Sequence, residues 1–217
     1  MGNEELKELA AQLRFPQGSK GIQVSDMMHE SNAKMIRKTI ESLHVSHNEE
    51  MFELGHGNAG HLHYLFEIEK STKYYGLEIS ELMHAEAKKI NKSFVEKNQV
   101  FFFMYDGIDM PFGDDYFDKG YTVNTLYFWN EPIKVLMEIY RVMKPGSVFA
   151  ITFGQRKSLE LLPFTKFGFE LYDTEKAEKL VKQTPFEIIH IENHAEVLKT
   201  KTGDTIQRDF TIMSLKK

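Results

Sequence analysis

The chain has 217 residues, of which 41% are apolar and 27% are charged, a composition typical of folded globular proteins rather than disordered ones. Lys and Arg number 27 against 32 Asp and Glu, so the net charge of -5 disfavours nucleic acid as the main partner. Cysteine is absent, which excludes disulfides, thiolate nucleophiles and cysteine-ligated metals.

The chain shows no targeting or membrane segment by its pattern. The longest apolar run, at residues 100–105, is far shorter than the roughly 20 residues that span a bilayer. Residues 3–5 are Asn-Glu-Glu, where a signal peptide has basic and then apolar residues. We therefore expect a cytoplasmic protein.

The N-terminal part of the chain is predicted to be helical. Apolar residues at helical spacing predict helices over residues 4–14 and 25–43, with Ser25 as the N-cap of the second. Pro and Gly predict a loop over residues 15–21 between them. We interpret residues 1–45 as a helical cap segment and residues 46–217 as the main domain of one compact unit.

Strands and helices alternate from residue 51 onwards. Strands are predicted over residues 51–54, 74–77, 100–105, 118–123 and 148–153, with helices over 60–69, 81–97 and 131–143. The sequence Lys144-Pro145-Gly146 predicts a turn after the third of these helices. Residues 100–105 are all apolar, which is typical of a strand buried on both faces. The alternation predicts a parallel sheet with helices on both faces.

The end of the chain breaks this alternation. After a predicted helix over residues 174–183, the strands predicted at 186–192 and 209–215 have no helical pattern between them, so we expect an antiparallel pair at one edge of the sheet. The predicted fold is an α/β, Rossmann-like three-layer sandwich, with a mostly parallel seven-stranded sheet and an antiparallel C-terminal strand pair.

A glycine-rich loop follows the first predicted strand. Gly55, Gly57 and Gly60 satisfy the pattern G-x-G-x-x-G, and Glu78 lies 18 residues beyond Gly60. This spacing is also that of a dinucleotide site with its ribose-binding acid, so an NAD(P)-dependent oxidoreductase is an open alternative. Glu53 opposes it, because a carboxylate at this strand end would repel a pyrophosphate.

Three acidic residues stand at the ends of three successive predicted strands: Glu53, Glu78 and Asp106. In parallel sheets, ligands bind beyond the carboxyl ends of the strands. S-adenosylmethionine has a group for each acid: an ammonium and a sulfonium, a ribose diol, and an adenine amino group. The set therefore favours this cofactor.

With these residues in place, the sequence resembles the class I S-adenosylmethionine-dependent methyltransferases. The likeness spans about residues 27–217 and is carried by blocks at residues 52–57, 75–80, 106–112, 117–118 and 136–146. Within that family the chain is most similar to small-molecule methyltransferases of the quinone-biosynthesis type. Ala59 stands at the position of the family's third loop glycine, with Gly60 following.

The resemblance implies the role of each residue in a cofactor site. Glu53 contacts the amino group of S-adenosylmethionine, Glu78 the ribose hydroxyls, and Asp106 the adenine amine. The other members of the implied site are Gly55 and Gly57 under the methionine part, Asn58 beside them, Ile79 packed on the adenine, Gly107 beside Asp106, and Asn124 near the methyl group.

The acceptor site is less determined by the sequence. His29 and Tyr127 are candidate catalytic residues, and His29, Tyr127, Trp129 and Phe167 are candidate substrate-binding residues. We expect no metal, because His61 and His63 lie two apart on a predicted helix and face different ways. We expect in-line methyl transfer to a small molecule, with no nucleic acid as partner and a possible homodimer. A non-catalytic domain that binds the cofactor or acts through protein contacts is a further alternative.

Overall fold

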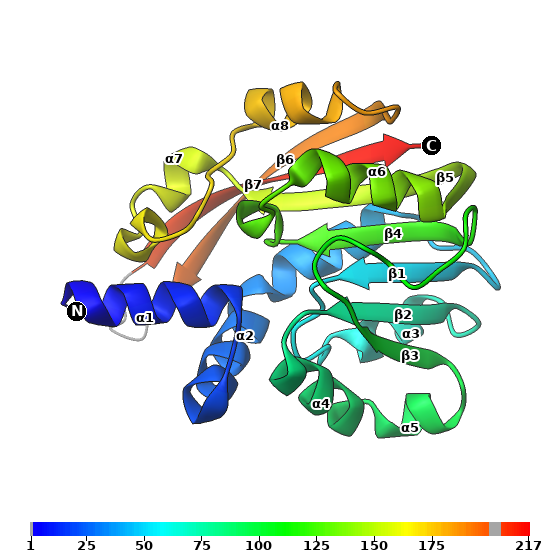
Figure 1. Cartoon of the computed structure of the whole chain (residues 1–217), viewed down its shortest axis with the longest axis horizontal. Helices are drawn as coiled ribbons and strands as arrows, with labels where there is room; N and C mark the ends of the chain where they lie inside the picture. The colour runs from blue at the N-terminus through cyan, green and yellow to red at the C-terminus, as the bar shows by residue number, and fades with distance from the viewer. Residues whose placement is uncertain (1, 200–204) are drawn as a thin grey trace.

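The computed structural model describes residues 2–199 and 205–217 and has the predicted three layers, a sheet between two sets of helices (Figure 1). The sheet order is β3-β2-β1-β4-β5-β7-β6. The strands are β1 Glu50–Leu54, β2 Lys73–Glu78, β3 Val100–Met104, β4 Phe117–Val123, β5 Met143–Gly154, β6 Glu187–Lys199 and β7 Thr205–Lys216. β1 to β5 pair in parallel, whereas β7 pairs antiparallel with both β5 and β6. The predicted fold class is confirmed.

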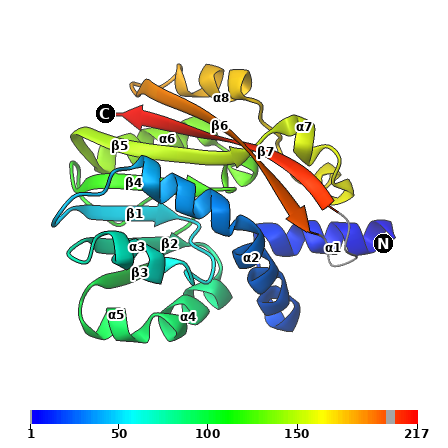
Figure 2. The same ribbon diagram turned by 180° about the vertical axis from the view of Figure 1, so that it is seen from behind.

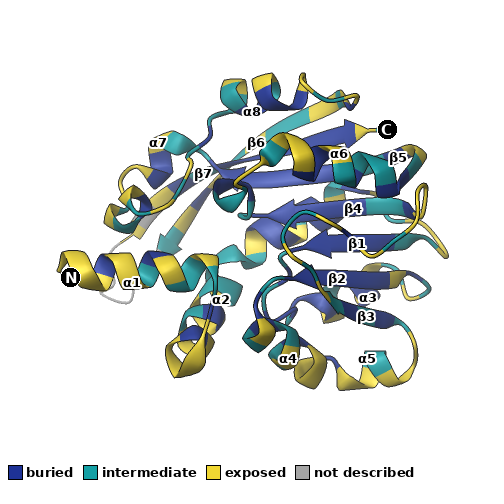
Figure 3. Cartoon of the chain, viewed as in Figure 1, coloured by how far each residue is buried: buried dark blue, intermediate teal, exposed yellow. Residues whose placement is uncertain are grey.

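The helices divide between the two faces of the sheet. They are α1 Asn3–Arg14, α2 Gly18–Ser42, α3 Leu62–Ile68, α4 Glu81–Ile90, α5 Lys92–Glu96, α6 Pro132–Val142, α7 Arg156–Leu159 and α8 Thr174–Val181, with 3-10 turns η1 Leu126–Phe128 and η2 Pro163–Lys166. The helices α2 and α3 lie over one face, seen from the front in Figure 2, and α6 and α8 lie over the other. Buried side chains of each pair pack on the sheet face that the pair covers. The central strands between these two cores are buried, as Figure 3 shows.

The N-terminal helices lie at the carboxyl ends of the parallel strands. In Figure 1, α1 and the first half of α2 stand beyond the arrowheads of β1 and β4. The second half of α2 enters the core, where Met35 and Ile40 are fully buried and the Thr39 hydroxyl lies 2.6 Å from that of Thr152 in β5. The two N-terminal helices therefore cover the sheet edge at which the candidate site residues lie.

The helix α2 begins earlier than predicted. It starts at Gly18 rather than after Ser25, which lies buried inside it. A side chain at Gly21 would come within 2.9 Å of the Pro16 backbone and 2.8 Å of Leu82. Glycine is therefore needed here for close packing within a helix, and not for a loop.

Two other predicted elements differ in detail. Residues 81–97 form two helices instead of one, because the Asn91 side chain between them donates hydrogen bonds to the backbone oxygens of Ala59 and Ala87. The predicted turn around Pro145 lies within β5, where Gly146 has a φ of +83° and the register with β4 shifts.

The strand β3 is less buried than its apolar run predicts. It is an edge strand that pairs only with β2; on one face Val100 and Phe102 are buried but Met104 is 39% exposed, and on the other face Phe101 and Phe103 are half-buried. An apolar run shows that a strand avoids water on its side-chain faces, but it does not show whether the strand ends the sheet.

Candidate functional site

A cavity of about 240 Å³ lies at the carboxyl ends of β1, β2, β3 and β4, with α1 and α2 along its other side. This edge includes the point between β1 and β4 where the strand order reverses, which is where open parallel sheets bind ligands. The nine residues predicted to bind the cofactor all line this cavity: Glu53, Gly55, Gly57, Asn58, Glu78, Ile79, Asp106, Gly107 and Asn124.

The glycine loop has the left-handed backbone that its sequence favours. Gly55 has a φ of +71° and Gly57 a φ of +57°. A side chain at Gly55 would come within 2.5 Å of Thr125, whereas the space beside Gly57 is open. Both positions therefore require glycine, the first for packing as well as backbone conformation.

The carboxylate of Glu53, at the end of β1, is 2% exposed. Its Oε2 atom accepts hydrogen bonds from the hydroxyls of Tyr74 at 2.5 Å and Tyr121 at 2.8 Å, and His61 Nε2 lies 2.9 Å from the same oxygen. Burial alone would raise the pKa of Glu53, but His61 and the hydrogen bonds from His61 and Tyr74 hold it below its usual value. Glu53 is therefore an ionised carboxylate in a nearly dry site.

Glu78, at the end of β2, is held by the backbone. Its Oε2 accepts from Gly57 N at 3.0 Å, and its Oε1 accepts from the N–H groups of Ile79 at 2.8 Å and Ser80 at 3.0 Å. Burial raises the pKa of Glu78 to about 7, although the three amides act in the opposite direction. The carboxyl group thus joins the glycine loop to the end of the neighbouring strand.

Asp106 follows β3 and is exposed. Its Oδ1 accepts from the backbone N–H groups of Ile108 and Asp109, each at 2.8 Å, and these bonds lower its pKa. Beside it, Gly107 has a φ of +95°, and a side chain there would lie 3.8 Å from Ile79. Among the described residues, every hydrogen bond to the Asp106 side chain uses Oδ1.

Asn124 follows β4 with a φ of +59°. Its side-chain oxygen accepts from the Tyr127 hydroxyl at 2.9 Å, and its amide nitrogen donates to Asn32 Oδ1 on α2, also at 2.9 Å. Asn124 is therefore fixed between the strand end and the helix that covers the cavity.

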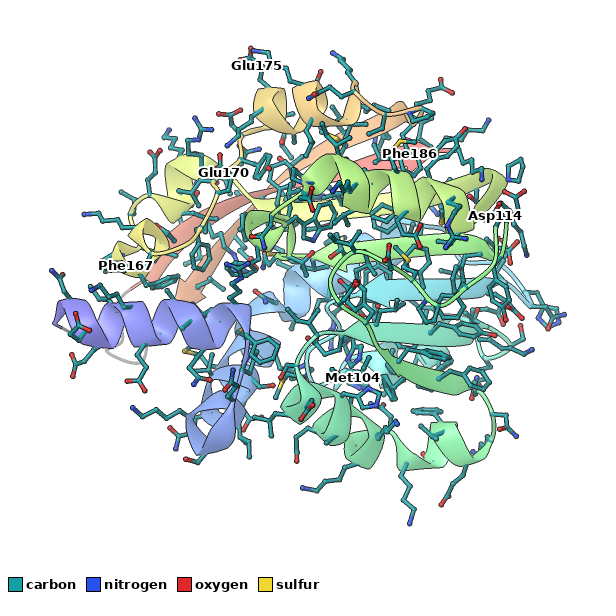
Figure 4. All side chains as sticks on the ribbon, viewed as in Figure 1. Met104, Asp114, Phe167, Glu170, Glu175 and Phe186 are labelled. Atoms are coloured by element: carbon teal, nitrogen blue, oxygen red, sulfur yellow. The ribbon has the colours of Figure 1, made fainter. Side chains whose placement is uncertain are left out.

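The structure brings only two of the four candidate substrate residues to the cavity, His29 and Trp129. Tyr127 lies behind the cavity, where its buried hydroxyl contacts Asn124 and the backbone of Gly154. Phe167 lies beside α1, with Lys7 Nζ 6.0 Å from the centre of its ring (Figure 4). Neither side chain lines the cavity.

His29 lies on α2 with its ring against Gly60, where an added Cβ would come within 2.9 Å of it. Burial and the neighbouring His61 and His63 lower the pKa of His29, so the ring is neutral near pH 7. His56, within the glycine loop, is buried with Nδ1 2.8 Å from Gly57 O, and burial lowers its pKa to about 4.

Sequence reasoning missed several contacts that hold residues of the cavity. It gave no role to Tyr74 or Tyr121, which bond Glu53, or to Arg208, whose NH1 donates to Asn32 Oδ1 at 3.2 Å. The available signal for the first two was a tyrosine hydroxyl within a strand predicted to be buried. Within the described part of the chain, no cluster of three or more His, Asp or Glu residues could hold a metal ion. The described helices also include none that is long and apolar enough to cross a membrane.

Comparisons with known proteins agree with this geometry. Residues 52–151 match a family model described as a methyltransferase domain. The chain is 26% identical to the methyltransferase YdaC of Bacillus subtilis over 132 residues, which are 61% of this chain and 71% of that protein. It is 27% identical over 131 residues to cycloartenol-C-24-methyltransferase 1 of Oryza sativa subsp. japonica, covering 57% of this chain but only 38% of that enzyme.

Solved structures show the same fold. A SAM-dependent methyltransferase from Aquifex aeolicus superposes with a TM-score of 0.65 over the whole of both chains, at 16% sequence identity. At that identity, the likeness concerns the arrangement of strands and helices.

Proposed function

We propose that this chain is a class I S-adenosylmethionine-dependent methyltransferase, and that its acceptor is a small molecule that enters the cavity between the strand ends and α2. One observation carries the proposal. Glu53, Glu78 and Asp106, from the ends of three adjacent parallel strands, line a single cavity together with Gly55 and Gly57.

The residues present fit the cofactor. The described residues bond Glu53 only at Oε2, which leaves Oε1 for the cofactor's ammonium. Asp106 likewise has Oδ2 for the adenine amine, while Glu78 takes the ribose hydroxyls. Ile79 and Gly107 flank the adenine in this proposal, Gly55, Gly57 and Asn58 surround the methionine part, and Asn124 lies near the methyl group.

When bound, the cofactor supplies a methyl group on a sulfonium with a good leaving group. The main task of the protein is therefore to hold donor and acceptor in line. In this proposal, His29, which lines the cavity, accepts a proton from an acceptor hydroxyl or amine, a step that matters when the acceptor must be deprotonated. Trp129 offers an aromatic surface for the acceptor.

Residues 1–45 act as the cap in this proposal, and residues 46–217 as the methyltransferase domain. α2 contributes Met28, His29, Asn32 and Ile36 to the cavity, so the cap forms part of the acceptor site and limits the entry of water. Cycloartenol-C-24-methyltransferase 1, by its name, acts on a small molecule, which supports an acceptor of that kind. The net charge of -5 opposes nucleic acid. A homodimer stays a prediction, which light scattering of the purified protein tests.

Calorimetric titration tests the cofactor site. We expect micromolar binding of S-adenosylmethionine and S-adenosylhomocysteine, and no binding of NADH or NADPH. Binding of a dinucleotide alone would contradict the proposal and favour the oxidoreductase alternative. Binding of the adenosyl compounds without turnover on any acceptor in a small-molecule screen would favour a non-catalytic role.

A further inference from the structure

The surroundings of Glu53 are unusual for a carboxylate at a strand end. Across the parallel sheet, Glu53 is paired with Gly76 on β2 and Tyr121 on β4. Tyr74 lies two residues before Gly76, and because side chains alternate along a strand, it belongs to the same face. Gly76 leaves room beside Glu53 that the ring of His56 fills, since an added Cβ would lie 2.6 Å from that ring.

Three donors from three elements meet on one oxygen. Tyr74 belongs to β2, Tyr121 to β4, and His61 directly precedes α3; Tyr74 and Tyr121 have no exposed surface. A carboxylate only accepts hydrogen bonds, so His61 Nε2, 2.9 Å from Oε2, carries its proton there. The three contacts share Oε2, although spreading them over both oxygens would satisfy the carboxylate more fully.

Burying an ionised carboxylate is costly, and replacing a buried polar cluster by apolar residues is often neutral or stabilising. A role in stability alone therefore does not explain why this cluster is present. The cavity explains it, because Glu53 lines the cavity while its Oε2 makes all three of these contacts. Contacts from three separate elements on one oxygen restrict the rotation of the carboxyl group.

We propose that Tyr74, Tyr121 and His61 are positioning residues that hold Glu53 Oε2, so that Oε1 faces the cavity and binds the ammonium of the cofactor's amino-acid part. This inference rests on the proposed function. It predicts that the cluster affects only the binding of ligands that carry that ammonium.

The experiment compares two ligands on the full chain by calorimetry. S-adenosylhomocysteine has the amino-acid part, whereas 5′-methylthioadenosine has the same nucleoside and thioether without it. We expect Tyr74→Phe and Tyr121→Phe each to lower the affinity for S-adenosylhomocysteine about tenfold, because each removes a hydrogen bond to the Glu53 carboxylate. Binding of 5′-methylthioadenosine should stay unchanged.

Tyr75→Phe is the matched control. Tyr75 is the next residue on β2, is also buried, and points its hydroxyl at Glu50 and Tyr116, each at 3.2 Å. Removing the Tyr75 hydroxyl should change neither the affinity for S-adenosylhomocysteine nor that for 5′-methylthioadenosine. Thermal unfolding of every variant shows that it is folded.

A double-mutant cycle tests whether Tyr74 acts through Glu53. Glu53→Gln should weaken the binding of S-adenosylhomocysteine. Adding Tyr74→Phe to that variant should cause no further loss of affinity. Equal losses for both ligands in the single tyrosine variants, or additive losses in the cycle, would overturn the inference. If wild-type protein binds S-adenosylhomocysteine and both tyrosine variants match it, the inference alone fails. If wild-type protein binds neither ligand, the proposed function fails, and the inference fails with it.

Discussion

The two walls of the cavity are built in different ways. The strand-end wall consists of Glu53, Gly55, Gly57, Glu78 and Asp106, which follow three adjacent strands within 54 residues of sequence. The cover wall consists of Met28, His29, Asn32, Ile36 and Trp129, four of which belong to α2. The first wall is held by the sheet's own hydrogen bonds, and the second by contacts with distant parts of the chain.

The cover wall depends on the far end of the chain. Arg208 on β7 is buried, donates to Ser31 O at 2.6 Å and to Asn32 Oδ1 at 3.2 Å, and pairs with Glu196 of β6 at 2.5 Å. Asn32 and Arg208 are 176 positions apart. The comparison teaches that the residues proposed for the cofactor lie close together in sequence, whereas the α2 residues proposed for the acceptor depend on the C-terminal hairpin.

The largest effect should come from breaking the anchor of the cover wall. Arg208→Met leaves Glu196 buried without its partner, so we expect the free energy of unfolding to fall by about 3 to 5 kcal/mol. Urea denaturation measures it. Lys34→Met is the control, because Lys34 Nζ joins α2 to Ala195 O at an exposed contact and its loss should cost less than about 0.5 kcal/mol. If the two substitutions lower the free energy of unfolding by the same amount, Arg208 is not the anchor of the cover wall.

The strand-end wall is tested by Glu78→Gln. We expect S-adenosylhomocysteine affinity to fall about a hundredfold, since an amide has one acceptor oxygen where the carboxyl group has two, so the ribose and the backbone N–H groups that Glu78 bonds lose an acceptor. Glu81→Gln, at an exposed position three residues further on, is the control and should leave the affinity unchanged. An unaltered affinity in Glu78→Gln would show that Glu78 does not contact the ribose.

The pH dependence of stability offers a smaller effect at the same wall. The pKa of Glu78 is about 7 in the folded chain because of burial, against an ordinary value of 4.5. Between these values the folded chain holds a proton that the unfolded chain has released, so this carboxyl makes the free energy of unfolding fall as pH rises, by at most about 1.4 kcal/mol per pH unit.

Urea denaturation of the ligand-free protein from pH 5 to pH 8 measures this slope. Glu78→Gln has no such group and should show a flatter profile. The same slope in both proteins would mean that the backbone amides of Gly57, Ile79 and Ser80 keep Glu78 ionised when folded.

The smallest effect on the cofactor should come from His29 in the cover wall. His29→Asn should change S-adenosylhomocysteine affinity by less than about threefold, because a neutral ring at this wall makes no charged contact with the cofactor. Methyl transfer to an acceptor that must lose a proton should fall by about a hundredfold. His190→Asn, an exposed change on β6 away from the cavity, is the control for both measurements. A large loss of affinity would place His29 in the cofactor site instead.

Prediction from sequence was most accurate where structure is local. The strands β1 and β2, which carry Glu53 and Glu78 near their ends, were recognised from short apolar runs, and the glycine loop from its spacing. The edge position of β3 was missed, because periodicity describes a strand's faces and not its neighbours. Tyr127 and Phe167 were expected in the cavity from their place after strands, but packing turned them toward Asn124 and α1.

The sequence by itself determined the order of strands and helices, the glycine loop and the three acids at one edge of the sheet. Each of these follows from backbone preferences and side-chain alternation over a few residues. Only the tertiary structure decided that Tyr74, Tyr121 and His61 share one oxygen of Glu53, and that Arg208 holds α2 over the cavity. Those contacts join residues from separate elements, and they form only when the helices pack on the sheet and bury the polar groups that must then find partners.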